Sequence, residues 1–371
     1  MKEGFKPKTE FIRDKKGLLI NNKTEIMNTW KEYFEQLLNQ NQNMEDNEDN
    51  EEENTDDGEG EEEEIIEPPT KEEVEEALKE QKLNKAPGGD NIPAELLKAG
   101  GQEGIIALHR IINKVWEEEK IPEDWGKSII CPIYKKVDKL TCSNYRGISL
   151  LPTAYTILTR ILKERLDPYI EKIIGEYQSG FRPNRSTIDN LFILRQITEK
   201  CWEFNTDIYL RFIDFKQAYD TIIRKKLRMI MSTFGIPTKL SRIINLTMTE
   251  TISQVKIQNQ LTECFKTNQG LKQGDSLAPS LFNLVLEYIV RKCNVDTRNT
   301  TAYKQTQIMA YADDIIIVSR SLRAVKETYK EIKTIAKTTG LEENVNKTKM
   351  LIQSRRNPRQ TGEINMEGDG I

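Results

Sequence analysis

Histidine and long apolar runs are scarce in this chain of 371 residues. His109 is the only histidine, which leaves little room for a Ser-His-Asp triad or a histidine-rich metal centre. No apolar run reaches the roughly 18 residues of a transmembrane helix, and the N-terminal segment "MKEGFKPKTEF" has no hydrophobic stretch for export. We therefore expect an intracellular protein, in the cytoplasm or the nucleus, with no signal peptide and no membrane partner.

Cysteine is also scarce, since the chain has only five. No two of them have the C-x-x-C spacing. Scattered cysteines of this kind are typical of reduced thiols in an intracellular protein. The sequence thus gives no indication of a zinc site or of a disulfide framework.

The net charge of −4 hides two very different regions. Residues 45–64 hold 14 acidic residues and no basic one, and without them 55 Lys and Arg stand against 45 Asp and Glu, a balance of +10. The basic remainder suits a polyanionic partner such as a nucleic acid. We expect residues 44–69 to form a disordered acidic linker; mimicry of nucleic acid is the alternative.

Helical patterns dominate the first half of the chain. A leader over residues 1–43 contains one apolar stripe at helical spacing, which we expect to pack on the main body. Thr70 and Glu73 have the spacing of a capping box for the next helix. Further helices are expected at about residues 104–119, 153–173 (with a break or kink at Pro168) and 187–203, with a strand near 128–137. The leader stripe consists of Ile26, Trp30, Phe34, Leu37 and Leu38.

From about residue 207 the pattern changes toward strands. The run "DIYLRFID" predicts a strand that ends at Asp214, and residues 218–235 predict one helix after it. "SQVKIQNQ" and "CFKTNQG" predict a small hairpin, "PSLFNLVLEYIVRKC" an apolar helix, and Gly340 the C′ position of a last helix. Helices first and a small antiparallel sheet later indicate a mixed α+β fold.

Asp313 and Asp314 lie between the apolar runs "IMAYA" and "IIIV", which predict a hairpin with both carboxylates at its tip. Asp214 ends another strand, so three carboxylates could converge on hard cations such as Mg²⁺. Two such ions suit phosphoryl transfer. Because neighbouring strand residues point to opposite faces, Asp313 and Asp314 need not contribute equally. A solvated Asp-Asp turn is the alternative interpretation of the pair.

Further segments lie in a definite order before, around and after these carboxylates. They are "WKEYFEQLLN" (30–39), "NKAPGGDNIPAELLK" (84–98), "PIYKKVDKLTCSNYRGISLL" (132–151), "YQSGFRPNRSTIDNLFILRQI" (177–197), "FIDFKQAYD" (212–220), "GLKQGDSLAPSLFN" (270–283), "YADD" (311–314) and "GLEENVNKTK" (340–349). Together they resemble the reverse transcriptase domain of non-LTR (LINE-type) retrotransposons. The match in order and spacing covers residues 84–350.

The resemblance implies a metal site with two Mg²⁺ ions, for which Mn²⁺ is a substitute. Asp214, Asp313 and Asp314 match the family's metal-binding triad, and the backbone carbonyl of Phe215 is expected to add an oxygen. Lys347 matches the lysine thought to protonate the leaving pyrophosphate; an exposed surface lysine is the alternative.

The resemblance also implies a nucleotide pocket. Tyr219 takes the position of the steric gate, an aromatic side chain that excludes a 2′-hydroxyl; a core aromatic is the alternative. Arg146 and one lysine, Lys135 or the near-equal candidate Lys136, correspond to the residues that grip the triphosphate. Gln273 and Gly274 match the Gln-Gly pair beside nucleotide and template, where glycine permits close approach; a plain turn is the alternative.

The implied architecture is the right-hand polymerase fold. Fingers with part of the palm would cover residues 70–206, the palm with its small antiparallel sheet would cover 207–350, and 351–371 would be a polar tail in place of a largely missing thumb. The chain departs from the family pattern in three places, which are "KQGDSLAP" in the template-side loop, tyrosine at position 219 and Glu343 where an apolar residue is usual.

The expected activity is RNA-directed DNA synthesis, in which a DNA primer on an RNA template is extended with dNTPs. One alternative is a catalytically inactive retrotransposon-derived remnant that binds RNA or a protein partner. Another is an RNA-templated RNA polymerase, which Tyr219 disfavours because such an enzyme needs a polar partner for the 2′-hydroxyl.

Overall fold

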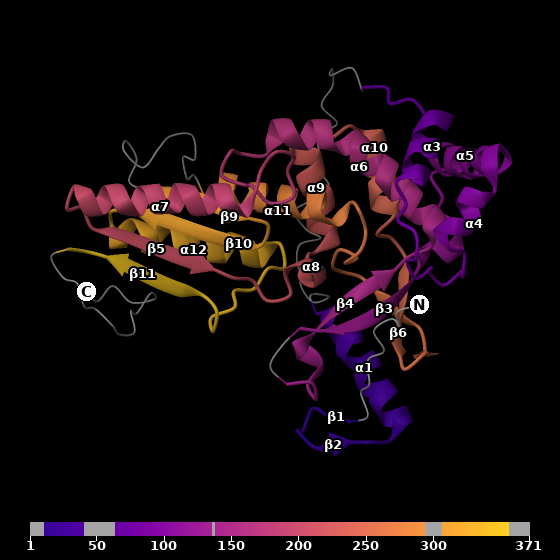
Figure 1. The fold of residues 1–371 in the computed structure, drawn as a ribbon, viewed down its shortest axis with the longest axis horizontal. Coiled ribbons are helices and arrows are strands. Elements are labelled where there is room, and N and C mark those ends of the chain that lie inside the picture. The colour runs from indigo at the N-terminus through magenta and orange to yellow at the C-terminus, as the bar shows by residue number, and fades with distance from the viewer. Residues whose placement is uncertain (1–10, 41–63, 136–137, 294–305, 356–371) are drawn as a thin grey trace, which may run out of the picture. The chain divides into compact units, whose positions relative to one another are not determined.

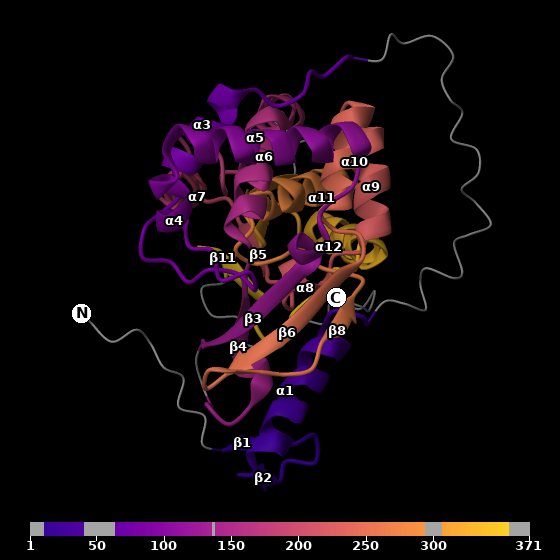
Figure 2. The ribbon, with the colours of Figure 1, turned by 90° about the vertical axis from the view of Figure 1, so that its right-hand side faces the viewer.

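The computed structural model describes residues 11–40, 64–135, 138–293 and 306–355 (Figures 1 and 2). Most of the acidic stretch expected as a linker, the end of the polar tail and Lys136 lie outside the described residues. The chain divides into two compact units. Unit 1 comprises residues 1–168 and 219–278, and unit 2 comprises residues 169–218 and 279–371.

Unit 1 is built around a mixed sheet. Strand β3 (Lys127–Tyr134) pairs antiparallel with β4 (Tyr145–Leu150) and parallel with β6 (Thr251–Ile257). Two short strands, β7 (Gln260–Leu261) and β8 (Phe265–Thr267), both pair antiparallel with β6. The predicted strand near 128–137 and the predicted hairpin are therefore confirmed.

The leader helix α1 (Lys23–Leu37) packs on this sheet, as the apolar stripe predicts. Asn22 caps its N-terminus, and the two-residue strands β1 (Ile12–Arg13) and β2 (Leu19–Ile20) precede it. Figure 2 shows α1 beside β6 and β8. The stripe residues join one buried cluster with side chains of the sheet, among them Ile26, Trp30, Phe34, Leu37, Ile130, Tyr145, Val255 and Phe265.

Gly147 of β4 makes this contact possible. A Cβ atom at Gly147 would lie 2.7 Å from the Phe34 ring, so a larger residue would push the leader helix off the sheet. The Trp30 ring meets the Tyr145 ring edge-on at 4.9 Å between centroids, a preferred aromatic geometry.

Most of the other helices of unit 1, among them α3, α5, α9 and α10, lie at the end of the unit away from α1 (Figure 2). The expected capping box of Thr70 and Glu73 is present at the start of α3. The helices are α3 (Lys71–Lys79), α4 (Ala94–Ala99), α5 (Gly101–Glu118), α6 (Thr153–Ile173), α8 (Ala218–Thr221), α9 (Arg224–Thr233) and α10 (Thr238–Leu246), with 3₁₀ turns at Glu123–Gly126 and Cys142–Asn144. No break occurs at Pro168, since α6 is a single element with this proline inside.

The prediction of one helix over residues 218–235 is wrong, because the chain leaves the helix between α8 and α9. The carbonyl of Tyr219 accepts a hydrogen bond from the Leu271 amide at 2.7 Å, and that of Ile222 accepts one from the Gly270 amide at 2.8 Å. Both carbonyls bond a distant loop and not the next helical turn. Tertiary bonding thus overrides local helix propensity.

Unit 2 contains a four-stranded antiparallel sheet in the order β11-β5-β10-β9. These strands are β5 (Ile208–Ile213), β9 (Thr306–Tyr311), β10 (Asp314–Ser319) and β11 (Lys349–Gln353). The expected strand–turn–strand around the aspartate pair is confirmed. In register, Ile315 of β10 pairs with Ile213 of β5, so the next positions along the two strands are Asp314 and Asp214.

Helices cover both faces of this sheet (Figure 1). Helix α7 (Thr187–Glu203) packs Leu194 and Ile197 against Leu210 and neighbouring apolar side chains on one face. Alternate residues of β5 face helix α12 (Leu322–Thr338), and α11 (Ala278–Lys292) supplies further buried apolar residues. Gly340 follows α12 with φ of 91° and occupies C′ of a Schellman motif, as predicted.

No helix within the described residues is both long and apolar enough to cross a membrane.

Trp30→Ala tests the contribution of the leader helix. Trp30 is fully buried against the sheet, so its truncation is expected to lower the free energy of unfolding by about 3–5 kcal/mol. Urea denaturation would measure the change. The neighbouring exposed Glu32, which pairs with Lys15, provides the control, since Glu32→Ala should change the free energy of unfolding by no more than about 0.5 kcal/mol. Equal effects of the two substitutions would contradict the packing described for α1.

Candidate active site

The aspartate pair is placed by a tight turn between β9 and β10. Tyr311 pairs with Asp314, which leaves Ala312 and Asp313 as the two turn residues. Ala312 has φ of 55°, in the left-handed region that residues with a side chain seldom adopt. A turn of this geometry needs support from its surroundings.

The segment Tyr177–Gly180 supplies that support. The Gln178 side-chain oxygen accepts hydrogen bonds from the amides of Ala312, at 3.0 Å, and Gly180, at 2.7 Å. A Cβ atom at Gly180 would lie 2.2 Å from the Ala312 nitrogen, so only glycine fits there. No sequence pattern assigned a role to Gln178 or Gly180. The feature of the sequence that could have indicated such a role is the glycine that follows two polar residues in the "YQSGF" segment.

Asp214 follows β5 and lines a cleft of about 390 Å³ together with Asp314 and Lys347. Helix α7 and the sheet provide the other walls, which are mostly apolar. The Lys347 ammonium lies 2.8 and 3.1 Å from the two carboxylate oxygens of Asp214. The Lys347 side chain thus forms an ion pair with the Asp214 carboxylate.

The residues around this cleft fit a hard divalent cation in their chemistry. They offer carboxylate oxygens and no histidine or thiolate, which is the donor set that Mg²⁺ prefers. The Asp214 carboxylate stabilises the positive charge of the Lys347 ammonium, as it would stabilise that of a metal ion. Among the residues that the structure describes, however, no three His, Cys, Asp or Glu side chains are close enough together to hold a metal ion.

The loop that carries Lys347 is fastened to β5 on both sides of Asp214. The Asn344 amide donates to the Asp214 carbonyl at 2.7 Å, and the Lys216 amide donates to the Glu342 carbonyl at 2.8 Å. Phe215 is buried and forms a backbone bridge with Glu343. Asp214, Phe215 and Lys347 are therefore held together by main-chain bonds.

Glu343, where the sequence resemblance leads us to expect an apolar residue, has polar partners in the fold. Its carboxylate pairs with Arg211 at 3.4 Å and accepts a hydrogen bond from the Tyr329 hydroxyl. The Arg211 guanidinium also lies 4.5 Å from the centre of the Tyr329 ring. The Glu343 side chain is 5% exposed, and a buried charge of this kind is tolerated because it is paired.

The expected triphosphate-binding residues lie on one strand pair of unit 1. Arg146 is on β4 opposite Ile133, and Lys135 directly follows β3, with its amide bonded to the Asn144 carbonyl at 2.9 Å. The ladder therefore brings the two cations to the same end of the hairpin. Lys136 lies outside the described residues, so the structure does not discriminate between the two lysines.

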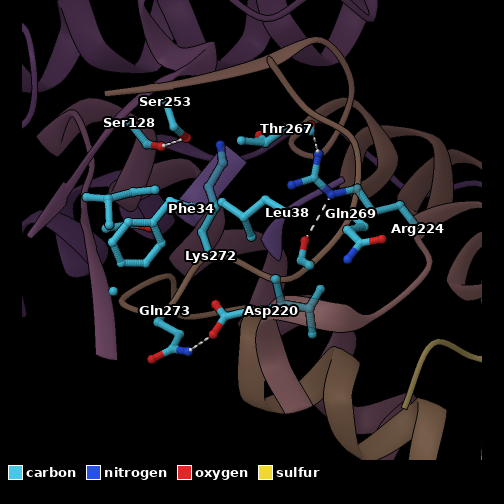
Figure 3. Close-up of a pocket in the computed structure, with 15 residues that line it drawn as sticks. Phe34, Leu38, Ser128, Asp220, Arg224, Ser253, Thr267, Gln269, Lys272 and Gln273 are labelled. Carbon is cyan, nitrogen blue, oxygen red and sulfur yellow. Dashed lines mark hydrogen bonds between the residues drawn. The ribbon is translucent and has the colours of Figure 1, made fainter. Parts of the chain in front are cut away.

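Figure 3 shows the Gln273 side chain next to Asp220, which belongs to α8. The Gln273 carbonyl accepts from the Ser149 amide at 2.7 Å. Gly274 has φ of 119°, and a Cβ atom there would lie 2.8 Å from the Ser149 carbonyl oxygen. The glycine is thus required by the close approach of this loop to β4. Tyr219 bonds to the same loop through its carbonyl, as described above.

Asp220, next to Tyr219, is a buried carboxylate that the sequence analysis did not single out. It accepts a hydrogen bond from the Gln273 side-chain amide at 2.8 Å. Burial raises the pKa of Asp220 to about 7, against the lowering effects of the Gln273 hydrogen bond and of the positive charges of Arg146 and Lys135. Asp220 is thus linked to three of the expected nucleotide-binding residues.

The structure gathers the expected site residues into two sets. Unit 2 holds Asp214, Phe215, Asp313, Asp314 and Lys347. Unit 1 holds Lys135, Arg146, Tyr219, Gln273 and Gly274.

Curated proteins similar to this chain include proteins of two transposons. The chain is 24% identical over 258 residues to the "Transposon TX1 uncharacterized 149 kDa protein" of Xenopus laevis, covering 69% of this chain and 20% of the relative. The "Probable RNA-directed DNA polymerase from transposon BS" of Drosophila melanogaster is 25% identical over 264 residues, covering 69% of this chain and 28% of that protein. This chain thus matches less than a third of either relative.

The fold resembles that of a solved telomerase. The structure of apo telomerase from Candida tropicalis, truncated from its C-terminal domain, aligns with a TM-score of 0.50 at 15% sequence identity. The alignment covers 66% of this chain and 56% of the telomerase chain. The family model described as "Reverse transcriptase (RNA-dependent DNA polymerase)" matches residues 133–364. The chain therefore belongs to the reverse transcriptase family, with distant homology to the enzymes of non-LTR retrotransposons.

Proposed function

We propose that the chain extends a DNA primer on an RNA template. The primer 3′-hydroxyl attacks the α-phosphate of a dNTP, a new phosphodiester bond forms, and pyrophosphate leaves. The observation that carries this proposal is the cleft shared by Asp214, Asp314 and Lys347 at one end of the antiparallel sheet.

The carboxylates of Asp214, Asp313 and Asp314, with the Phe215 carbonyl, would hold two Mg²⁺ ions. When bound, these ions supply Lewis-acid activation of the attacking hydroxyl and stabilise charge on the leaving oxygen. The tight turn at Ala312 fixes the backbone of Asp313 before substrate arrives, which lowers the cost of organising the site.

Lys347 would serve two purposes at different times. Without metal, its ammonium neutralises the Asp214 carboxylate at 2.8 Å. With the Asp214 carboxylate engaged in holding a metal ion, the Lys347 ammonium would be available as a proton donor to the pyrophosphate oxygen. A lysine beside phosphate oxygens suits this general-acid role.

The residues of unit 1 would bind the nucleotide. Arg146 and Lys135 would make charge-assisted bonds to the triphosphate, and the Gln273-Gly274 loop would contact the base pair and the sugar. The Tyr219 ring would fill the space that a 2′-hydroxyl needs, so that dNTPs are preferred over rNTPs.

Asp313→Asn tests the carboxylate site. The substitution keeps the size of the side chain but removes a negative charge that metal binding needs, so we expect primer extension with Mg²⁺ and dNTPs on an RNA template to fall by at least about 100-fold. Gel analysis of a labelled primer would measure it.

The matched control for this experiment is Glu327→Gln, which removes a surface carboxylate paired with Arg323 on α12 and should leave extension unchanged. Equal extension by wild type and Asp313→Asn would refute the assignment of the aspartates. A folded wild-type chain that binds RNA but never extends the primer would favour the inactive remnant instead.

Tyr219→Ala tests the steric gate. Removal of the ring makes room for a 2′-hydroxyl, so the ratio of rNTP to dNTP incorporation should rise by about tenfold or more. Single-nucleotide extension assays with matched dNTP and rNTP would measure this ratio. Tyr219→Phe keeps the ring and should leave the ratio near the wild-type value. If the wild type prefers rNTPs, the chain is an RNA polymerase and the proposal of DNA synthesis fails.

A further inference from the structure

Asp220 is a buried carboxylate of unit 1 that the proposed chemistry does not use. It lies in α8 directly after Tyr219 and is only 9% exposed. In Figure 3 its carboxylate points toward the Gln273 side chain, and the two residues line the same pocket as Arg224 and Lys272. A buried carboxylate is costly and needs compensating partners.

The Gln273 amide is the direct partner of Asp220. Its nitrogen donates to the carboxylate at 2.8 Å, which leaves the side-chain oxygen of Gln273 on the other side of the amide group. Without an acceptor at this place, the amide could rotate and exchange its nitrogen and oxygen. Asp220 therefore determines which hydrogen-bonding atom Gln273 offers.

The backbone fixes both ends of this interaction. Besides the bonds from Leu271 to Tyr219 and from Gly270 to Ile222, the chain at Gly270 approaches Asp220 closely. A Cβ atom at Gly270 would lie 2.6 Å from the Asp220 carbonyl oxygen. The helix that carries the gate and the loop that carries Gln273 thus form one rigid local assembly.

We propose that Asp220 is a positioning residue of the nucleotide pocket, which holds the Gln273 side-chain amide in one orientation beside the gate residue Tyr219. This inference rests on the proposed function, because it assigns Gln273 and Tyr219 to dNTP binding. Asp220 acts through Gln273 and need not touch the nucleotide.

Charged groups from several elements surround Asp220, which makes its role dependent on pH. Arg146 from β4 and Lys135 after β3 favour its ionised form, and Arg224 of α9 and Lys272 of the loop line the same pocket. Because its pKa is about 7, the carboxylate is protonated below this pH and ionised above it. Ionised Asp220 repels a triphosphate and competes for the same cations, so dNTP affinity should fall as the pH rises from 6 to 8.5.

The experiment measures dNTP binding without chemistry. The full chain is bound to an RNA template with a dideoxy-terminated DNA primer, and the affinity for the next matched dNTP is measured with Mg²⁺ present. At pH 6, where the Asp220 carboxyl is uncharged, Asp220→Leu removes the acceptor and should weaken dNTP binding by about tenfold, as expected for the loss of one hydrogen bond. At the same pH, Asp220→Asn keeps an acceptor oxygen and should change the affinity by less than about threefold.

A double-substitution cycle separates positioning from general destabilisation. If Asp220 acts through Gln273, the chain with both Asp220→Leu and Gln273→Leu should bind dNTP about as weakly as Gln273→Leu alone. Additive losses would overturn the proposal, as would unchanged affinity in Asp220→Leu. Thermal unfolding of each chain verifies that it is folded.

The pH profile of Asp220→Asn provides a readout that remains if Asp220→Leu does not fold. The wild type should lose dNTP affinity between pH 6 and 8.5, whereas Asp220→Asn should show a flat profile over this range. The same decline in both chains would overturn the role of the carboxylate. A wild type that binds dNTP but does not extend an unblocked primer refutes the proposed function alone, and a wild type that binds no dNTP refutes both.

Discussion

The close backbone contact between Gly180 and Ala312 is the constraint on which the carboxylate site depends. Ala312 needs a left-handed conformation so that the hairpin can turn in two residues, and the Gln178 side chain binds its amide in that conformation. The contact leaves no space for a Cβ atom at Gly180. Asp313 is the second residue of this turn and Asp314 begins β10, so their backbone positions are determined by a segment that precedes them by more than a hundred residues.

A similar principle operates in the nucleotide pocket. The break between α8 and α9 frees the carbonyls of Tyr219 and Ile222 to bond the loop at Gly270 and Leu271. These tertiary hydrogen bonds replace helical ones and connect α8 to the loop at Gly270 and Leu271. In both units, therefore, main-chain bonds to distant segments position the candidate site residues. Such preorganisation would lower the cost of arranging these side chains around a substrate.

Glu343 shows how the fold accommodates a buried carboxylate. A carboxylate in place of an apolar residue would be costly in isolation, but Arg211 and Tyr329 neutralise and bind it. The pairing leaves the neighbouring loop bonded to Asp214 through Asn344 and Lys347. The sequence alone does not reveal this pairing, because Arg211 and Tyr329 precede Glu343 by 132 and 14 residues.

Most of the elements could be predicted from local sequence patterns. Apolar spacing predicted α1 with its buried face and the β9–β10 hairpin, the Thr70/Glu73 spacing predicted the capping box of α3, and Gly340 predicted the end of α12. The folded chain alone reveals that α8 ends before α9, that Gly180 supports Ala312 and that Asp220 binds Gln273. These features depend on contacts between distant segments, whose partners no local pattern specifies.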